Sequence, residues 1–152
     1  MIANGRVFLT DGTRLFGFDL LTGKSLTLPA KFADAPLVYP DKAVPDASPS
    51  LTAAGDRLYV RVGPPLVKPP DHTKPKPTEE TAIVCLGPGT AKDMREMWRL
   101  HPPGDGKTPI VWEGAPLVSG RRMWAVHARF EGGRVVHGIE CYDPADAASA
   151  PT

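Results

Sequence analysis

One pattern of strands and turns occurs three times along this chain, and such repetition constrains the fold more than any other feature of the sequence. A turn led by glycine enters an apolar strand at residues 4–9, 55–60 and 120–125. A following strand then carries one small residue, which is Gly17, Cys85 or Cys141. The units differ in length, and loop insertions account for the difference because lengthening a loop costs little free energy.

The first copy is the clearest hairpin in the sequence. Residues 6–10 and 14–18 are apolar segments on either side of Asp11-Gly12, a pair that tolerates the positive φ angles of a tight turn. Leu21-Thr22-Gly23-Lys24 then makes a second turn into residues 25–28. This part of the chain therefore predicts a meander of strands.

The second and third copies have one more strand before the glycine-led turn, at residues 50–52 and 115–118. Four short antiparallel strands in sequence form a sheet of the kind found in a propeller blade. We therefore predict an all-β propeller of about three four-stranded antiparallel blades, an incomplete arc with about ten strands. The expected units are residues 1–29, 48–100 and 114–152. A helical turn near residues 92–95 is the one expected exception, and a β-sandwich is the alternative fold.

Residues 5–24 resemble the pyrroloquinoline-quinone-like (PQQ-like) propeller repeat. In that family a strand ends in a small residue, an apolar residue and aspartate, and a Thr-Gly-Lys turn and a strand carrying tryptophan follow. Residues 17–19 and 22–24 fit this pattern, and Trp98 resembles the docking tryptophan of the second unit. The third unit keeps the aspartate, as Asp143, but not the turn glycine.

The resemblance also implies what a catalytic member of the family would need. A quinone site in such a member combines acidic and amide ligands for calcium, a stacking tryptophan and adjacent cysteines. That combination is not visible in this sequence. We therefore predict no catalytic, cofactor-binding or metal-binding residues and no cofactor. For a longer bacterial protein of this family, the resemblance suggests an extracytoplasmic location.

The two cysteines occupy the place that Gly17 has in the first unit. Cys85 and Cys141 are therefore expected to be small residues buried between blades, superimposable on Gly17. A reactive thiol or a disulfide is the alternative. A disulfide would require the two Cα atoms to lie within about 7 Å of each other.

Two histidines, His127 and His137, lie on strands joined by the Gly132-Gly133 turn and invite interpretation as metal ligands. A two-residue turn, however, sets a register that places the two imidazoles on opposite faces of the sheet. We therefore predict that they do not share a ligand. His72 and His101 lie in proline-rich loops and are expected to be solvated.

Asp19 and Asp143 recur at one place in the repeat. Recurrence favours a role in the following turn, where aspartate accepts backbone N–H groups, over an acid/base pair. Trp98, Trp112 and Trp124 lie in apolar strands, which favours packing in the core or between blades over a stacking platform for a ligand.

Composition and charge argue against several other classes of protein. Lysine and arginine number 18 against 17 aspartates and glutamates, so no basic surface for nucleic acid is indicated. The sequence contains no apolar run long enough to cross a membrane and no pattern typical of a secretory signal.

Residues 64–80 form a proline-rich insertion that we expect to be mobile, and residues 30–47 form a second irregular connection.

The sequence therefore favours a non-catalytic propeller scaffold or binding module, as a fragment of a larger PQQ-like repeat protein. The alternatives are a fragment of a PQQ-dependent dehydrogenase whose cofactor ligands lie outside this chain, and an outer-membrane assembly or sensor protein. Expected partners are an unidentified protein or the remaining blades of a larger propeller. Self-association is also expected, because three blades do not close a ring. The first unit is predicted to lack its leading strand.

Overall fold

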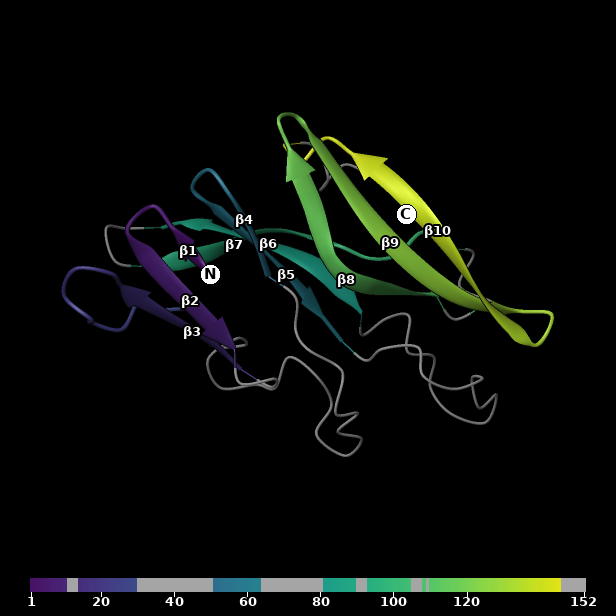
Figure 1. Ribbon diagram of the computed structural model, residues 1–152, viewed down its shortest axis with the longest axis horizontal. Helices are drawn as coiled ribbons and strands as arrows, with labels where there is room; N and C mark the ends of the chain where they lie inside the picture. The colour runs from purple at the N-terminus through teal and green to yellow at the C-terminus, as the bar shows by residue number, and fades with distance from the viewer. Residues whose placement is uncertain are drawn as a thin grey trace.

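The computed structural model describes residues 1–10, 14–29, 51–63, 81–89, 93–104, 108 and 110–145. These residues form ten β-strands in three antiparallel sheets and contain no helix (Figure 1). The predicted all-β class and strand number are therefore confirmed. The predicted helical turn near residues 92–95 is wrong, since Met94 begins strand β7 (Met94–Leu100), in which buried and exposed side chains alternate at several positions.

Sheet 1 contains β1 (Ile2–Ala3), β2 (Arg6–Thr10) and β3 (Leu15–Asp19), in that order. The predicted absence of a leading strand is wrong. Asn4 and Gly5 have φ angles of 49° and 68°, which turn the chain back so that β1 pairs with β2. The register of this pairing places Ile2 opposite Val7.

Sheet 2 is a complete four-stranded meander in the order β4 (Leu51–Ala54), β5 (Arg57–Val62), β6 (Ala82–Pro88) and β7. The residues of β6 are buried from its start through Gly87. A continuous apolar run of this kind is typical of a strand that is covered on both faces. Sheet 2 is therefore the central layer of the described structure.

Sheet 3 contains β8 (Ile110–Ser119), β9 (Arg122–Glu131) and β10 (Arg134–Tyr142), with β9 in the middle. Gly132 and Gly133 have φ angles of 58° and 78°, the conformation required by the two-residue turn between β9 and β10. A bulge interrupts the pairing of β8 with β9 between Glu113 and Leu117.

The central hairpin has the same register in all three sheets. The small residue of each repeat lies opposite an aromatic residue, and the pairs are Phe8–Gly17, Tyr59–Cys85 and Trp124–Cys141. The preceding pairs are also equivalent: Val7–Phe18, Leu58–Leu86 and Met123–Tyr142. The repeat recognised in the sequence is therefore present in the strand pairing.

Because side chains alternate along a strand, each sheet has two faces that can be named from these pairs. The forward face is the one that carries Phe8, Tyr59 or Trp124. The rear face is the one that carries Val7, Leu58 or Met123.

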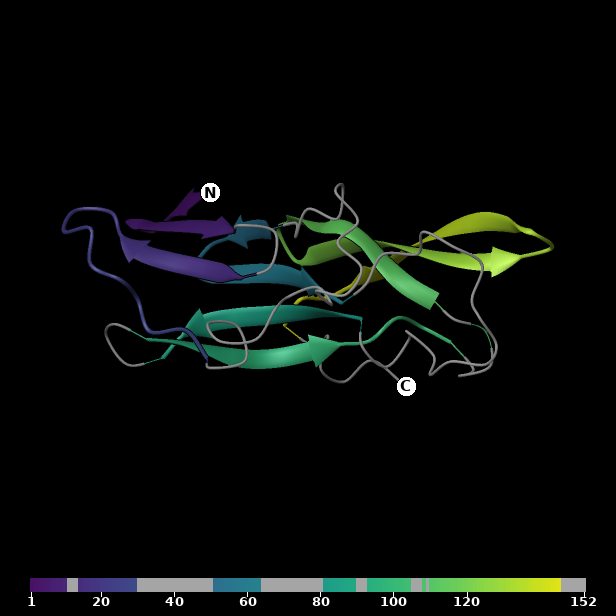
Figure 2. The same cartoon turned by 90° about the horizontal axis from the view of Figure 1, so that it is seen from below.

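Two hydrophobic cores join the three sheets, and sheet 2 lies between the other two (Figures 1 and 2). The first core packs the forward face of sheet 1, with Phe8, on the rear face of sheet 2, with Leu58. The second packs the forward face of sheet 2, with Tyr59, on the rear face of sheet 3, with Met123. One type of interface is thus used twice.

The predicted strand at residues 25–28 forms two isolated bridges instead of a full strand. Ser25 pairs with Phe18 of sheet 1, whereas Thr27 pairs in parallel with Asp93, and its carbonyl accepts the N–H of Met94 at 3.0 Å. This segment therefore links sheet 1 to sheet 2. The predicted turn before it is confirmed, with Gly23 at a φ of 67°.

Several expectations concern residues outside the described ranges: the turn at Asp11-Gly12, the irregular connection at residues 30–47, the proline-rich insertion at residues 64–80, and His72. Within the described ranges, none of the three sheets closes on itself. No helix in this part of the chain is long and apolar enough to cross a membrane.

Candidate functional site

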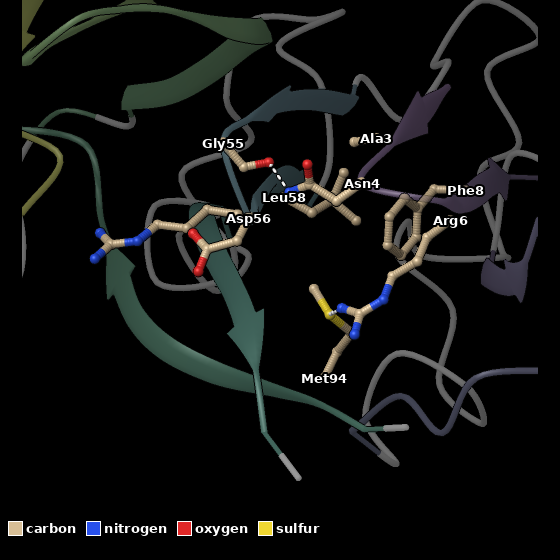
Figure 3. Close-up of a pocket in the computed structure, with 9 residues that line it drawn as sticks. Ala3, Asn4, Arg6, Phe8, Gly55, Asp56, Leu58 and Met94 are labelled. Atoms are coloured by element: carbon tan, nitrogen blue, oxygen red, sulfur yellow. Dashed lines mark hydrogen bonds between the residues drawn. The ribbon is translucent and has the colours of Figure 1, made fainter. Parts of the chain in front are cut away.

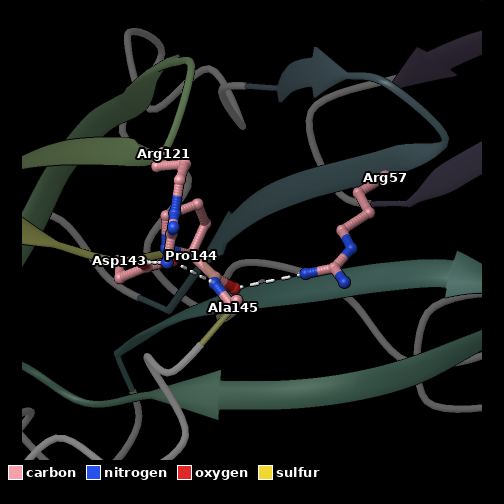
Figure 4. Close-up of polar contacts among 5 residues, drawn as sticks. All are labelled: Arg57, Arg121, Asp143, Pro144 and Ala145. Carbon is pink, nitrogen blue, oxygen red and sulfur yellow. Dashed lines mark hydrogen bonds and ion pairs between the residues drawn. The ribbon is translucent and has the colours of Figure 1, made fainter.

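The repeated aspartates stabilise turns, as predicted. The Asp19 carboxylate accepts the backbone N–H groups of Leu21 and Thr22 at 3.1 and 2.8 Å, and the Thr22 hydroxyl at 2.8 Å. Asp143 accepts the N–H of Ala145 at 2.9 Å (Figure 4). Hydrogen bonds from the Thr22 hydroxyl and amide lower the pKa of Asp19, and the bond from the Ala145 amide lowers the pKa of Asp143.

The turn that follows Asp143 also anchors sheet 2 to sheet 3. The carbonyl of Pro144 accepts a guanidinium N–H of Arg57 at 3.2 Å (Figure 4) and the indole N–H of Trp98 at 3.0 Å. Arg121 forms an ion pair with Asp143 at 3.2 Å beside them. Asp143 therefore stabilises a turn in which the carbonyl of Pro144 accepts hydrogen bonds from two side chains of sheet 2.

The tryptophans differ in their surroundings. Trp98 and Trp112 are buried in the core between sheets 2 and 3, and the Trp112 indole donates to the carbonyl of Leu100 at 2.9 Å. The packing predicted for these two is confirmed. Trp124 is half-buried and lies on the forward face of sheet 3, away from both cores.

The two cysteines are free thiols at equivalent register positions but in different surroundings. Cys85 is fully buried, and burial raises its pKa to about 11. Cys141 is exposed, so the prediction that Gly17, Cys85 and Cys141 are all buried is wrong for the third unit. The reason is that sheet 3 packs on the forward face of sheet 2, whereas no described sheet covers Cys141.

The histidines occupy separate environments, as the register predicted. His127 pairs with Gly138 and His137 with Ala128, so the imidazoles lie on opposite faces. His127 is buried, with Nε2 3.5 Å from Glu140, and Nδ1 has no hydrogen-bond partner among the described residues. His137 is exposed and lies 3.0 Å from Glu113. These are two separate histidine–glutamate pairs.

His101 is exposed, but it has a specific contact that the sequence did not predict. Its Nδ1 lies 3.1 Å from the carbonyl oxygen of Thr81.

A small pocket lies between sheets 1 and 2 (Figure 3). It has room for about one water molecule. Asn4 donates a hydrogen bond to the carbonyl of Gly55 at its edge, and the Arg6 guanidinium points at the sulfur of Met94, 3.1 Å away. The pocket is a seam between two packed sheets and is too small to hold an organic ligand.

The acidic groups and indoles that the resemblance would assign to a quinone site can be located in the described ranges. No group of three or more His, Cys, Asp or Glu side chains in these ranges is placed to hold a metal ion. The two buried indoles, of Trp98 and Trp112, have their faces in the core and their N–H groups bonded to backbone carbonyls. They are therefore not available to stack on a cofactor.

Comparison of the chain with protein-family models finds no match, and comparisons with curated proteins and with solved structures find none either. The PQQ-like resemblance therefore rests on the residues of the repeat.

The sequence interpretation missed the arginine that opens the second strand of each unit. Arg6 contacts Met94 of sheet 2, and Arg57 contacts Pro144 of sheet 3. The equivalent residue in sheet 3, Arg122, is exposed. An arginine follows each of the three glycine-led turns in the sequence. This recurrence was a signal for contact with the neighbouring sheet, in the same way that the recurrence of the aspartates indicated their role in turns.

Proposed function

We propose that this chain is a non-catalytic scaffold or binding module built from PQQ-like propeller repeats. The observation that carries the proposal is the repeated interface, in which a forward face packs on the rear face of the next sheet and all three hairpins share one register. Radial repetition of small antiparallel sheets is the construction principle of a propeller. The three sheets would then be successive blades.

The polar side chains with defined partners support a structural role. Asp19 and Asp143 hold turns, and Arg57 and Trp98 join two sheets through one carbonyl. Within the described ranges, these groups are used within the fold and do not converge on a space that could hold a substrate. Function in a module of this kind depends on its exposed surfaces.

Titration with PQQ and calcium, followed by thermal unfolding, tests the proposal. A ligand that binds the folded state raises the melting temperature in a saturable way. We expect no saturable rise for this chain, whereas a quinone-dependent dehydrogenase measured in parallel as a positive control should show one. A saturable rise for this chain would overturn the scaffold proposal in favour of a quinone-binding enzyme fragment.

A further inference from the structure

Two apolar faces remain exposed at opposite ends of the stack. The first is the rear face of sheet 1, formed by Ile2, Val7, Leu9, Phe16 and Phe18, which lie together by strand register. Ile2 is 65%, Leu9 50% and Phe16 37% exposed. No charged residue belongs to this set, and contiguous apolar surface of this kind marks an interaction site.

The second is the forward face of sheet 3, formed by Leu117, Trp124, Val126, Ile139 and Cys141. Leu117 is 65% and Ile139 70% exposed, and the Cys141 thiol lies among them. The Glu113–His137 pair borders this surface, and beyond it Val111 and Ala128 on the same face are buried. The exposed part is therefore a defined patch near Cys141.

The fold itself shows what covers each kind of face. Both interfaces within the chain place a forward face on a rear face. The exposed face of sheet 3 is a forward face, and the exposed face of sheet 1 is a rear face. These two faces cannot meet within one chain, because sheet 2 packs between sheets 1 and 3 (Figure 1).

We propose that the occupant of each face is a second copy of this chain, with the forward face of sheet 3 packed on the rear face of sheet 1 of the second copy. This inference rests on the scaffold function proposed above and names its partner. The contact is heterologous, so it builds a ring where the rotation closes and a filament where it does not. Either assembly repeats the interface that the chain already contains twice.

In the interface between sheets 2 and 3 the recurring arginine supplies a polar contact to a backbone carbonyl, whereas in the interface between sheets 1 and 2 Arg6 contacts the sulfur of Met94. Arg57 reaches from the forward face of sheet 2 to the carbonyl of Pro144, the residue after the turn aspartate of sheet 3. Arg122 has the equivalent place in sheet 3 and is exposed. The carbonyl equivalent to that of Pro144 in sheet 1 belongs to the residue after Asp19, and Arg122 would donate to this carbonyl, that of Leu20, in the second copy.

Light scattering after size exclusion, from micromolar to millimolar protein, measures the association. Wild type is expected to form species larger than a monomer. Leu9→Glu blocks the rear face of sheet 1, and Ile139→Lys blocks the forward face of sheet 3. Each variant alone should be monomeric and folded, because both side chains are exposed. Met97→Glu is the matched control: Met97 is 41% exposed, lies on β7 of sheet 2 outside both faces, and the variant should associate like wild type.

Mixing the two monomeric variants separates head-to-tail packing from other modes. Leu9→Glu keeps its forward face and Ile139→Lys keeps its rear face, so the mixture should form a one-to-one complex through the two unaltered faces. A monomeric wild type, association that persists in either single variant, or a mixture that fails to pair would each overturn the inference. A monomeric wild type would leave the scaffold function standing, whereas saturable quinone binding would overturn that function and leave the packing unaffected.

Discussion

The forward faces of sheets 2 and 3 carry equivalent residues in one register, yet one face is buried and the other is largely exposed. Ile83 is 1% exposed and its equivalent, Ile139, is 70% exposed. Cys85 is buried and Cys141 is exposed. The local sequence is therefore not what sets burial in this fold. The neighbouring sheet sets it, because sheet 3 packs on Tyr59, Ile83 and Cys85.

The largest difference between the two faces is expected in the rates at which their thiols, Cys85 and Cys141, react. In dilute native protein, we expect Cys141 to react with a disulfide reagent at least about 1000-fold faster than Cys85, since reaction at a buried thiol requires an opening that costs several kcal/mol. Before any opening, the raised pKa of Cys85, about 11, keeps the buried thiol protonated, and reaction in the closed state is negligible because the thiolate is the reactive form. Stopped-flow absorbance gives both rates.

Cys141→Ser is the control for the thiol experiment and should remove the fast phase alone. Fast reaction of both thiols would contradict the difference in burial. A fast phase that slows as protein concentration rises would further support the head-to-tail packing, because the second copy would cover Cys141.

A matched pair of lysine substitutions compares the two faces energetically. Ile83→Lys places an unpaired charge in the core between sheets 2 and 3, and we expect it to lower the free energy of unfolding by about 4 kcal/mol or more. Ile139→Lys changes an exposed position and should alter it by less than about 0.5 kcal/mol. Urea unfolding at micromolar protein measures both. Similar losses would mean that the forward face of sheet 3 is already covered within one chain.

The features that were predictable from sequence are those set by local geometry. Gly132-Gly133 fixes a two-residue turn and hence the register that separates the two histidines, and Asp19 is followed by the amides that it binds. The exposure of Cys141 was not predictable in this way, because it depends on which sheet packs against it. Strand β1 was missed because two residues are too few for a period-two pattern.

Substitutions of the recurring arginine compare the same two sheets, and their effects on the free energy of unfolding should be smaller than that of Ile83→Lys. Arg57→Met removes the bond to the Pro144 carbonyl while keeping much of the apolar stem, and should lower the free energy of unfolding by about 1–2 kcal/mol. Arg122→Met should cost less than about 0.5 kcal/mol in the monomer, because the equivalent side chain is exposed there.

Trp98→Phe allows a double-mutant cycle with Arg57→Met. Both side chains donate to the same Pro144 carbonyl, so the two losses should not add. Strictly additive losses would show that the two donors act independently and that the turn after Asp143 does not work as a single anchor.

The smallest effect is expected at the turn aspartates, Asp19 of sheet 1 and Asp143 of sheet 3. Asp19→Asn keeps an oxygen that can accept the Thr22 amide but removes the negative charge. Hydrogen bonds lower the pKa of Asp19 in the folded state, so its charge contributes stability above the unfolded pKa, and this contribution is lost as pH falls through the folded pKa. The wild type should therefore melt at a slightly higher temperature than the variant from neutral pH to about pH 5, and this gap in melting temperature should close in more acidic solution.

Asp143→Asn should behave in the same way, because the Ala145 amide lowers the pKa of that carboxyl too. Calorimetry over this pH range checks both, and a gap that persists unchanged in acid would show that the carboxylate charge does not stabilise these turns.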